Sequence, residues 1–169
     1  MQNFTFYLPT EIVFGRATEF CVGQEVRKHG GTKVLLVYGG RSAKESGLLD
    51  RVKHTLADEA LAVAEWGGAQ PNPRLDHAEA GVELALREQV DFILAVGGGS
   101  VIDTAKAIAH GTANPGVRLW DIWTGKAQLT RSLPVGAVLT IAAAGSETSD
   151  SAVLTNMEVG KKAGINTPL

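Results

Sequence analysis

Residues 92–106 read FILAVGGGSVIDTAK, an apolar stretch that runs through three glycines into a segment of helical character. The apolar residues before Gly97 are typical of a strand buried on both faces of a parallel sheet. Because glycine has no side chain, the N–H groups of Gly97, Gly98 and Gly99 can approach a ligand closely, and the positive end of the next helix favours an anion. The stretch therefore predicts a site for the phosphates of a nucleotide.

This turn departs from the commonest dinucleotide-binding fingerprint, because Ile102 stands where a third glycine is expected. The alternative interpretation is an ordinary strand-to-helix connection in which Ser100 caps the helix and Asp103 completes a capping box. We favour the phosphate site, because three consecutive glycines are costly to order in a folded chain.

Outside this turn, strand-like and helical segments alternate along the chain. Strands are predicted at residues 33–38, 60–66 and 133–140, and helices over residues 18–29, from 42 onward, and over 75–88. This order predicts an α/β, Rossmann-like parallel sheet flanked by helices. Two β-like runs, at residues 4–8 and 11–14, predict an N-terminal β-hairpin or edge strand outside that sheet.

The composition limits the function classes. With 169 residues, of which 44% are hydrophobic and 20% charged, the chain fits one dinucleotide-binding domain over residues 1–169. A net charge of −2 with dispersed Lys and Arg favours neither nucleic acid nor membrane as a partner. The sequence shows neither a bilayer-length apolar run nor a secretory leader, and it has one cysteine, Cys21, so we expect a cytoplasmic protein.

In a parallel sheet, ligands bind where the carboxyl ends of the strands meet. We therefore expect the turn at residues 71–73 and the Thr140 region to lie beside the glycine turn. The residues expected to hold the pyrophosphate are Gly97, Gly98, Gly99 and Ser100, and those expected to add hydroxyl donors are Thr140, Ser146 and Thr148. A turn or cap role is the alternative for each of the last three.

The turn after residues 33–38 indicates which nucleotide is bound. It reads Gly39-Gly40-Arg41-Ser42 and has no acidic residue to accept from the ribose hydroxyls of NAD(H). Glycine leaves room for a 2′-phosphate, Arg41 can pair with it and Ser42 can donate to it. This favours NADP(H), with NAD(H) as the alternative. In the competing interpretation, Ser42 is a helix cap answered by Glu45 and Arg41 is a solvated cation.

Asp103 and Lys106 lie three residues apart and share one face of the helix after the glycine turn. Asp103 is therefore the candidate catalytic residue, orienting a nicotinamide or a substrate hydroxyl, and capping beside an exposed Lys106 is the alternative. The histidines, His29, His54, His77 and His110, are scattered and show no metal-ligand spacing, so we expect no metal site on this chain.

The run at residues 97–106 resembles the signature of the iron-containing (group III) alcohol dehydrogenases, whose superfamily includes glycerol dehydrogenase and dehydroquinate synthase. Segments at residues 6–9, 12–15, 37–42, 71–73 and 144–147 agree in family order. The similarity is closest to the NADPH-dependent butanol dehydrogenase and aldehyde reductase branch. It implies an N-terminal nucleotide-binding domain followed by an all-helical domain that holds iron or zinc on one Asp and three His beyond residue 169.

The resemblance also implies which residues contact the cofactor: Gly39, Gly40, Ser42, Asn72, Gly97, Gly98, Gly99, Ser100, Asp103, Thr140 and Lys162. Ala143-Ala144 departs from the Gly-Thr of many relatives, which puts one pyrophosphate contact in doubt. Because the sequence stops directly after a β-like run, we expect a truncated chain that lacks the helical metal domain and is inactive alone.

For the complete enzyme, the resemblance implies hydride transfer between the nicotinamide and a small alcohol or aldehyde. An edge-forming N-terminal strand makes a homodimer plausible. The alternatives are a stand-alone, non-catalytic nucleotide-binding module and a relative of glycerol dehydrogenase or dehydroquinate synthase.

Overall fold

The computed structural model describes residue 3 and residues 7–169, and its centre is a four-stranded parallel sheet. The strands lie in the order β2-β1-β3-β4. Their bounds are Lys33–Tyr38 for β1, Ala62–Trp66 for β2, Phe92–Gly97 for β3 and Val135–Leu139 for β4. The parallel α/β sheet predicted from the sequence is thereby confirmed.

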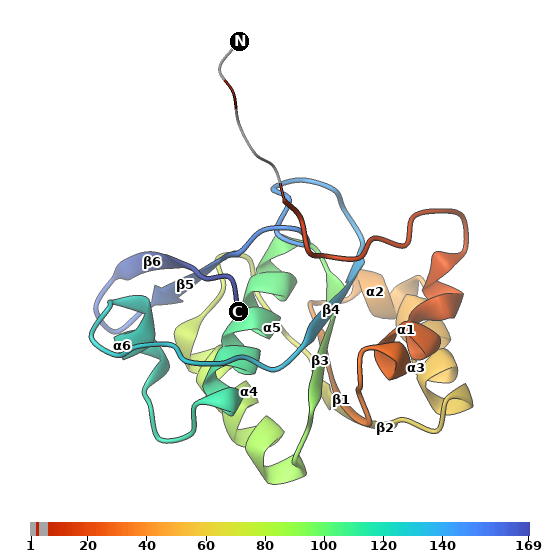
Figure 1. Cartoon of the computed structure of the whole chain (residues 1–169), viewed down its shortest axis with the longest axis horizontal. Coiled ribbons are helices and arrows are strands. Elements are labelled where there is room, and N and C mark those ends of the chain that lie inside the picture. Colours follow the sequence, from red (N-terminus) through yellow and green to blue (C-terminus); the bar gives the residue numbers. More distant parts are fainter. Residues whose placement is uncertain (1–2, 4–6) are drawn as a thin grey trace.

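Helices cover both faces of the sheet. Figure 1 shows α1 (Val22–Lys28) and α3 (Leu48–Asp58) to the right of the strands and α4 (Leu75–Glu88) and α5 (Gly99–Ala113) to the left. Successive residues of β1 point to opposite faces. Leu35 and Val37 belong to the core on the α4 and α5 side, whereas Val34 and Leu36 belong to the core on the α1 and α3 side. All four side chains are fully buried, as expected for a central parallel strand.

The connections reverse direction between β1 and β3. Both strands are neighbours in the sheet, with Tyr38 beside Val96, yet the chain leaves β1 toward β2 and leaves β3 toward β4 on the opposite side. Such a reversal opens a crevice beyond the carboxyl ends of the two strands, where α/β proteins bind their ligands. The glycine turns that begin at Gly39 and at Gly97 flank this crevice.

Five further elements complete the fold. Their bounds are Thr18–Cys21 for the 3₁₀ helix η1, Ser42–Glu45 for α2, Leu119–Trp123 for α6, Ser151–Asn156 for β5 and Lys161–Asn166 for β6. β5 and β6 form an antiparallel hairpin, and Ala152 and Leu154 of β5 are buried in the core beside α5. The helix predicted from residue 42 is interrupted at Gly47, whose φ of 70° suits glycine.

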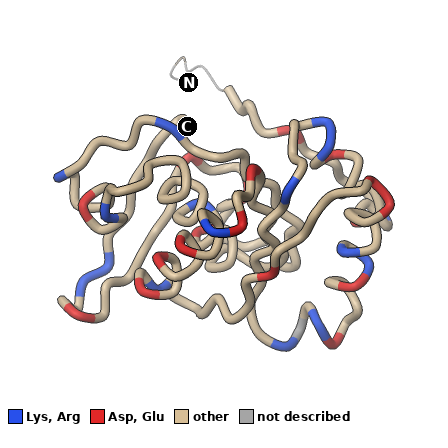
Figure 2. Tube along the Cα trace, turned by 90° about the horizontal axis from the view of Figure 1, so that it is seen from below, with Lys and Arg blue, Asp and Glu red and all other residues tan. Residues whose placement is uncertain are grey.

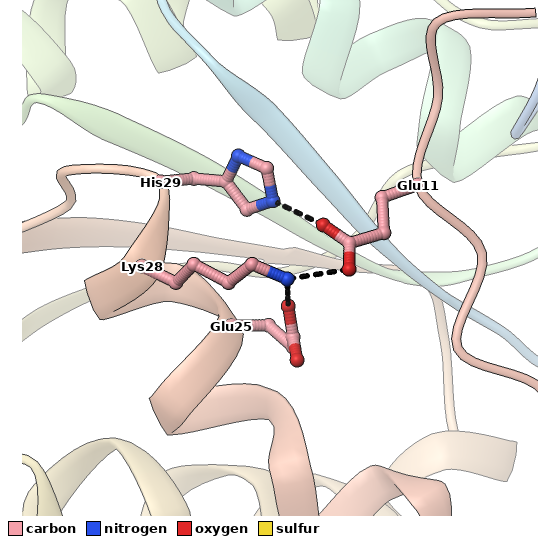
Figure 3. A network of polar contacts seen from close by, with 4 residues as sticks. All are labelled: Glu11, Glu25, Lys28 and His29. Atoms are coloured by element: carbon pink, nitrogen blue, oxygen red, sulfur yellow. Dashed lines mark hydrogen bonds and ion pairs between the residues drawn. The ribbon is translucent and has the colours of Figure 1, made fainter.

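The N-terminal β-hairpin is not formed in the described residues. The prediction for residues 4–6 lies outside them, and residues 7–14 have no regular secondary structure. Pro9 removes one backbone donor, and the segment is held by side chains instead. Figure 3 shows the Glu11 carboxylate, which accepts from Lys28 and from the His29 ring, the latter at 3.2 Å. Homodimer formation through an edge strand stays a prediction.

Charged residues are dispersed over the surface. Figure 2 shows Lys and Arg interspersed with Asp and Glu along the trace, as their dispersion in the sequence suggests. Over the described residues, the helices are too short or too polar for any of them to cross a bilayer.

Candidate functional site

A cleft of about 370 Å³ lies at the carboxyl edge of the sheet, beside the glycine turn. Its walls come from the first turns of α5, the turn before α4, the loop after β4 and the hairpin of β5 and β6. The lining residues are Asn72, Pro73, Gly99, Ser100, Asp103, Ala143, Ala144, Ser146, Ser149, Ser151, Val153 and Lys162. The fold thus brings together residues from segments up to ninety positions apart in the chain.

Backbone donors without an acceptor in the described part of the chain lie at the start of α5, where Gly99 and Ser100 line the cleft. The helix begins at Gly99, and the first turn is closed by the N–H groups of Val101 and Ile102, which donate to the Gly98 carbonyl at 2.9 and 3.2 Å. Within the described residues, the N–H groups of Gly98, Gly99 and Ser100 have no acceptor. These orphan donors and the positive end of a fifteen-residue helix form an anion-binding arrangement.

The three glycines have different structural roles. A Cβ at Gly97 would come within 2.5 Å of Val101 Cγ2, so a bare backbone is required there for packing. A Cβ at Gly98 would lie 3.0 Å from Ile141 Cγ2, and one at Gly99 would lie 3.7 Å from Ser146 Cβ. The protein could therefore accommodate a methyl group at Gly99, and this glycine keeps open space in the cleft.

The capping-box interpretation of Ser100 and Asp103 is wrong. The residue before the helix is Gly98, which offers no side-chain cap, and Ser100 already lies within the first turn. Asp103 instead accepts from the Ser146 hydroxyl and from the Val153 N–H, the latter at 3.2 Å. The helix begins two residues earlier than that interpretation requires, and Asp103 is directed to the loop across the cleft.

Lys106 is not the exposed cation of the alternative interpretation. It is half-buried, and its ammonium donates to carbonyl oxygens of the loop that follows β4. Burial lowers the pKa of Lys106 from its ordinary value, and the nearby Asp103 and Asp150 oppose this shift. The contact partners lie about forty residues away in the chain, so no local sequence signal indicated them.

Asn72 and Lys162 meet at the rim of the cleft. Asn72 has a φ of 57°, a left-handed conformation that asparagine tolerates, and its Oδ1 accepts from Lys162 Nζ at 3.0 Å. Two residues that the resemblance implied as cofactor contacts are thus neighbours in the structure. Their role toward a cofactor stays a prediction.

Other predicted residues lie at the same sheet edge but outside the cleft lining. Gly39 follows β1 next to the glycine turn, since a Cβ there would lie 3.4 Å from Val101 Cγ2. Gly40 and Arg41 are exposed beyond it, and Ser42 opens α2. Thr140 is exposed and its N–H donates to the Gly97 carbonyl at 3.1 Å.

Thr148 has the turn role that was its alternative interpretation. Its hydroxyl and its N–H both donate to the Gly145 carbonyl, at 3.2 and 3.1 Å. Ser149 and Ser151 line the cleft and were missed from the sequence. The signal that could have found them is the serine-rich stretch at residues 146–151, which lies between a glycine and a strand.

The four histidines lie apart. His110 is buried, its Nδ1 is 2.9 Å from the Ser132 hydroxyl, and burial lowers its pKa to about 4. His77 stacks on Trp66 with ring centroids 4.9 Å apart. In the part of the chain that is described, the one group with metal-ligand spacing is Glu11, Glu25 and His29. Lys28 already bridges its two carboxylates (Figure 3), so we assign no metal there.

Comparison with known proteins decides the family. Residues 9–169 match the family model described as iron-containing alcohol dehydrogenase. The chain belongs to the iron-containing alcohol dehydrogenase family. This confirms the resemblance seen at the glycine turn.

Members of this family are similar along the whole chain. A probable NADH-dependent butanol dehydrogenase of Bacillus subtilis is 47% identical over 169 residues, which are 100% of this chain and 43% of that protein. An NADPH-dependent aldehyde reductase of Escherichia coli is 37% identical over 164 residues, 96% of this chain and 41% of that protein. The chain thus spans less than half the length of these relatives.

A solved structure has the same fold. The crystal structure of NADH-dependent butanol dehydrogenase A from Thermotoga maritima superposes with a TM-score of 0.94 at 42% identity, covering 99% of this chain and 42% of that one. The fold of this chain is therefore shared with part of a solved structure.

Proposed function

We propose that this domain binds a nicotinamide dinucleotide, with the diphosphate on the N–H groups of Gly98, Gly99 and Ser100. The observation that carries the proposal is the placement of these three donors, which have no acceptor among the described residues, at the point where the sheet connections reverse. Glycine at positions 98 and 99 leaves the space that a phosphate needs. The residues present therefore fit the group.

When bound, the dinucleotide supplies or accepts a hydride, so the domain serves an alcohol dehydrogenase or aldehyde reductase. The family and the relatives of both kinds support this activity for the whole protein. In this role the first turn of α5 holds the diphosphate, and Asn72 and Lys162 border the same cleft. That Asp103 orients the nicotinamide or the substrate stays a prediction, since its carboxylate already accepts two hydrogen bonds from the opposite wall.

We propose NADP(H) as the preferred dinucleotide. The names of the relatives divide, because the Bacillus subtilis protein is called NADH-dependent and the Escherichia coli protein NADPH-dependent. The support comes from the turn after β1, where Gly39 and Gly40 replace an acidic residue and the exposed Arg41 can pair with a 2′-phosphate.

A divalent metal for the whole enzyme is part of the proposal, supported by the family description. We infer that its ligands lie outside these 169 residues, because the described histidines are separated.

The test is a fluorescence titration of the 169-residue chain with NADPH and with NADH. We expect NADPH to bind about tenfold more tightly, which corresponds to about 1.4 kcal/mol for one charge-assisted contact. Arg41→Ala should remove this difference and leave NADH affinity unchanged. Equal affinities in the unsubstituted chain would contradict the NADP(H) assignment, and failure to bind either nucleotide would contradict the proposed function.

A further inference from the structure

The ammonium of Lys106 is fully hydrogen-bonded. It donates to the carbonyl oxygens of Ser146, Ser149 and Ser151 at 2.7, 2.7 and 2.9 Å. A protonated lysine has three N–H donors, and all three are used here. The side chain is therefore neither a solvated surface cation nor a free base for proton transfer.

The three acceptors belong to one wall of the cleft. We call residues 145–151 the serine loop; Ser146, Ser149 and Ser151 line the cleft from this side. The first turn of α5, with Gly99 and Ser100, lines the cleft from another side. Because Lys106 is on α5 as well, its three bonds join the serine loop to the helix that carries the proposed phosphate donors.

Asp103 adds two bonds in the same direction. Its carboxylate accepts from the Ser146 hydroxyl and, at 3.2 Å, from the N–H of Val153, two residues after the loop. The other hydrogen bonds of the loop backbone are local or lead to the end of β6. The Thr148 N–H donates to Gly145 at 3.1 Å and the Ser151 N–H to Ser149 Oγ at 2.9 Å, and the Asp150 carbonyl accepts from the Thr167 N–H at 2.9 Å. None of these bonds joins the loop to α5.

Removing the ammonium would remove the three hydrogen bonds by which Lys106 joins the serine loop to α5. Three carbonyl oxygens would lose their common donor, and unpaired buried polar groups are costly. The loop could satisfy them by moving toward water, which would change the width of the cleft. A ligand would then have to restore the loop on binding, at a cost in affinity.

We propose that Lys106 is a positioning residue that fixes the serine loop against α5 and so preorganises the nucleotide cleft. This inference rests on the proposed function only for the identity of the ligand. The effect on the loop belongs to the free chain and is measurable without any nucleotide.

The experiment compares the 169-residue chain with Lys106→Met, which keeps the length of the side chain and removes its charge and donors. Hydrogen exchange of the free chains reports the loop, and a fluorescence titration with NADPH reports the cleft. We expect the amides of Thr148 and Ser151 to exchange at least about tenfold faster. We expect the Kd for NADPH to rise about thirtyfold, from the loss of several charge-assisted bonds.

Three control variants separate positioning from general stability. Lys106→Arg keeps a charged group with several donors and should restore most of the loop protection and affinity. Lys161→Met removes an exposed lysine of β6 and should change neither readout. Ile108→Val weakens the core on the same helix, and should lower the melting temperature without raising the Kd.

Each outcome decides one claim. Unchanged loop exchange in Lys106→Met would overturn the positioning role, as would failure of Lys106→Arg to restore either readout. If the unsubstituted chain does not bind NADPH, the proposed function fails, while the exchange comparison in the free chain still decides the role of Lys106.

Discussion

The substitution Gly99→Ala tests whether the backbone at the start of α5 holds a phosphate. The added methyl group would lie 3.7 Å from Ser146 Cβ, an ordinary contact distance, and Gly99 has helical geometry that alanine adopts readily. The fold should therefore be retained. Gly99 and Ser146 both line the cleft, so the methyl group would stand in the space between them.

The expected loss follows from the bonds that the methyl group prevents. A phosphate displaced by a carbon atom loses good geometry with the neighbouring N–H groups, and two charge-assisted hydrogen bonds at about 1.5 kcal/mol each amount to about 3 kcal/mol. At about 1.4 kcal/mol per tenfold change, the Kd for NADPH should rise by roughly a hundredfold.

The assay is a titration of the variant and of a matched control with NADPH, with a thermal melt of each. Gly164→Ala is the control, because its methyl group also meets neighbours at an ordinary 3.7 Å but stands on β6 outside the cleft lining. An unchanged Kd in a folded Gly99→Ala chain would show that the diphosphate does not lie on these donors.

Further predictions concern the rim, the core and the pH dependence. Lys162→Met should weaken NADPH binding about fivefold, from the loss of about 1 kcal/mol of exposed electrostatic attraction, and no change in the titration would remove this residue from the site. Ile108→Ala should lower the free energy of unfolding by about 2–5 kcal/mol, measured by urea denaturation, because the side chain is fully buried; a loss below about 1 kcal/mol would contradict that packing. His110 has a pKa of about 4 in the folded chain against 6.5 in its ordinary state, so the unfolded chain binds more protons between these values. The free energy of unfolding should therefore fall by about 3 kcal/mol as the pH drops from 6.5 to 4, and His110→Gln should lack this part of the slope.

The sheet and the position of the cleft could be predicted because they depend on local patterns. Residues 34–38 and 92–96 are continuous apolar runs, which are typical of a strand buried on both faces of a sheet, and both lie in strands. Once the strands are parallel, their carboxyl ends share one edge, which places the turn at residues 71–73 beside the glycine turn. The helix at residues 75–88 was also predicted with its observed bounds.

The parts that were not predicted depend on contacts between distant residues. Residues 11–14 are a β-like run, but Glu11 is held by Lys28 and His29 instead of by a neighbouring strand. The spacing of Asp103 and Lys106 indicated a shared helix face, and only the fold shows that this face meets the serine loop. Such tertiary partners leave no periodic signal in the sequence.

The crystal structure of the 169-residue chain soaked with NADPH would test the central claim most directly. We expect the diphosphate oxygens within hydrogen-bond distance of the N–H groups of Gly98, Gly99 and Ser100. Density for the coenzyme at another place on the domain, with these three donors facing only water, would contradict the assignment of the glycine turn.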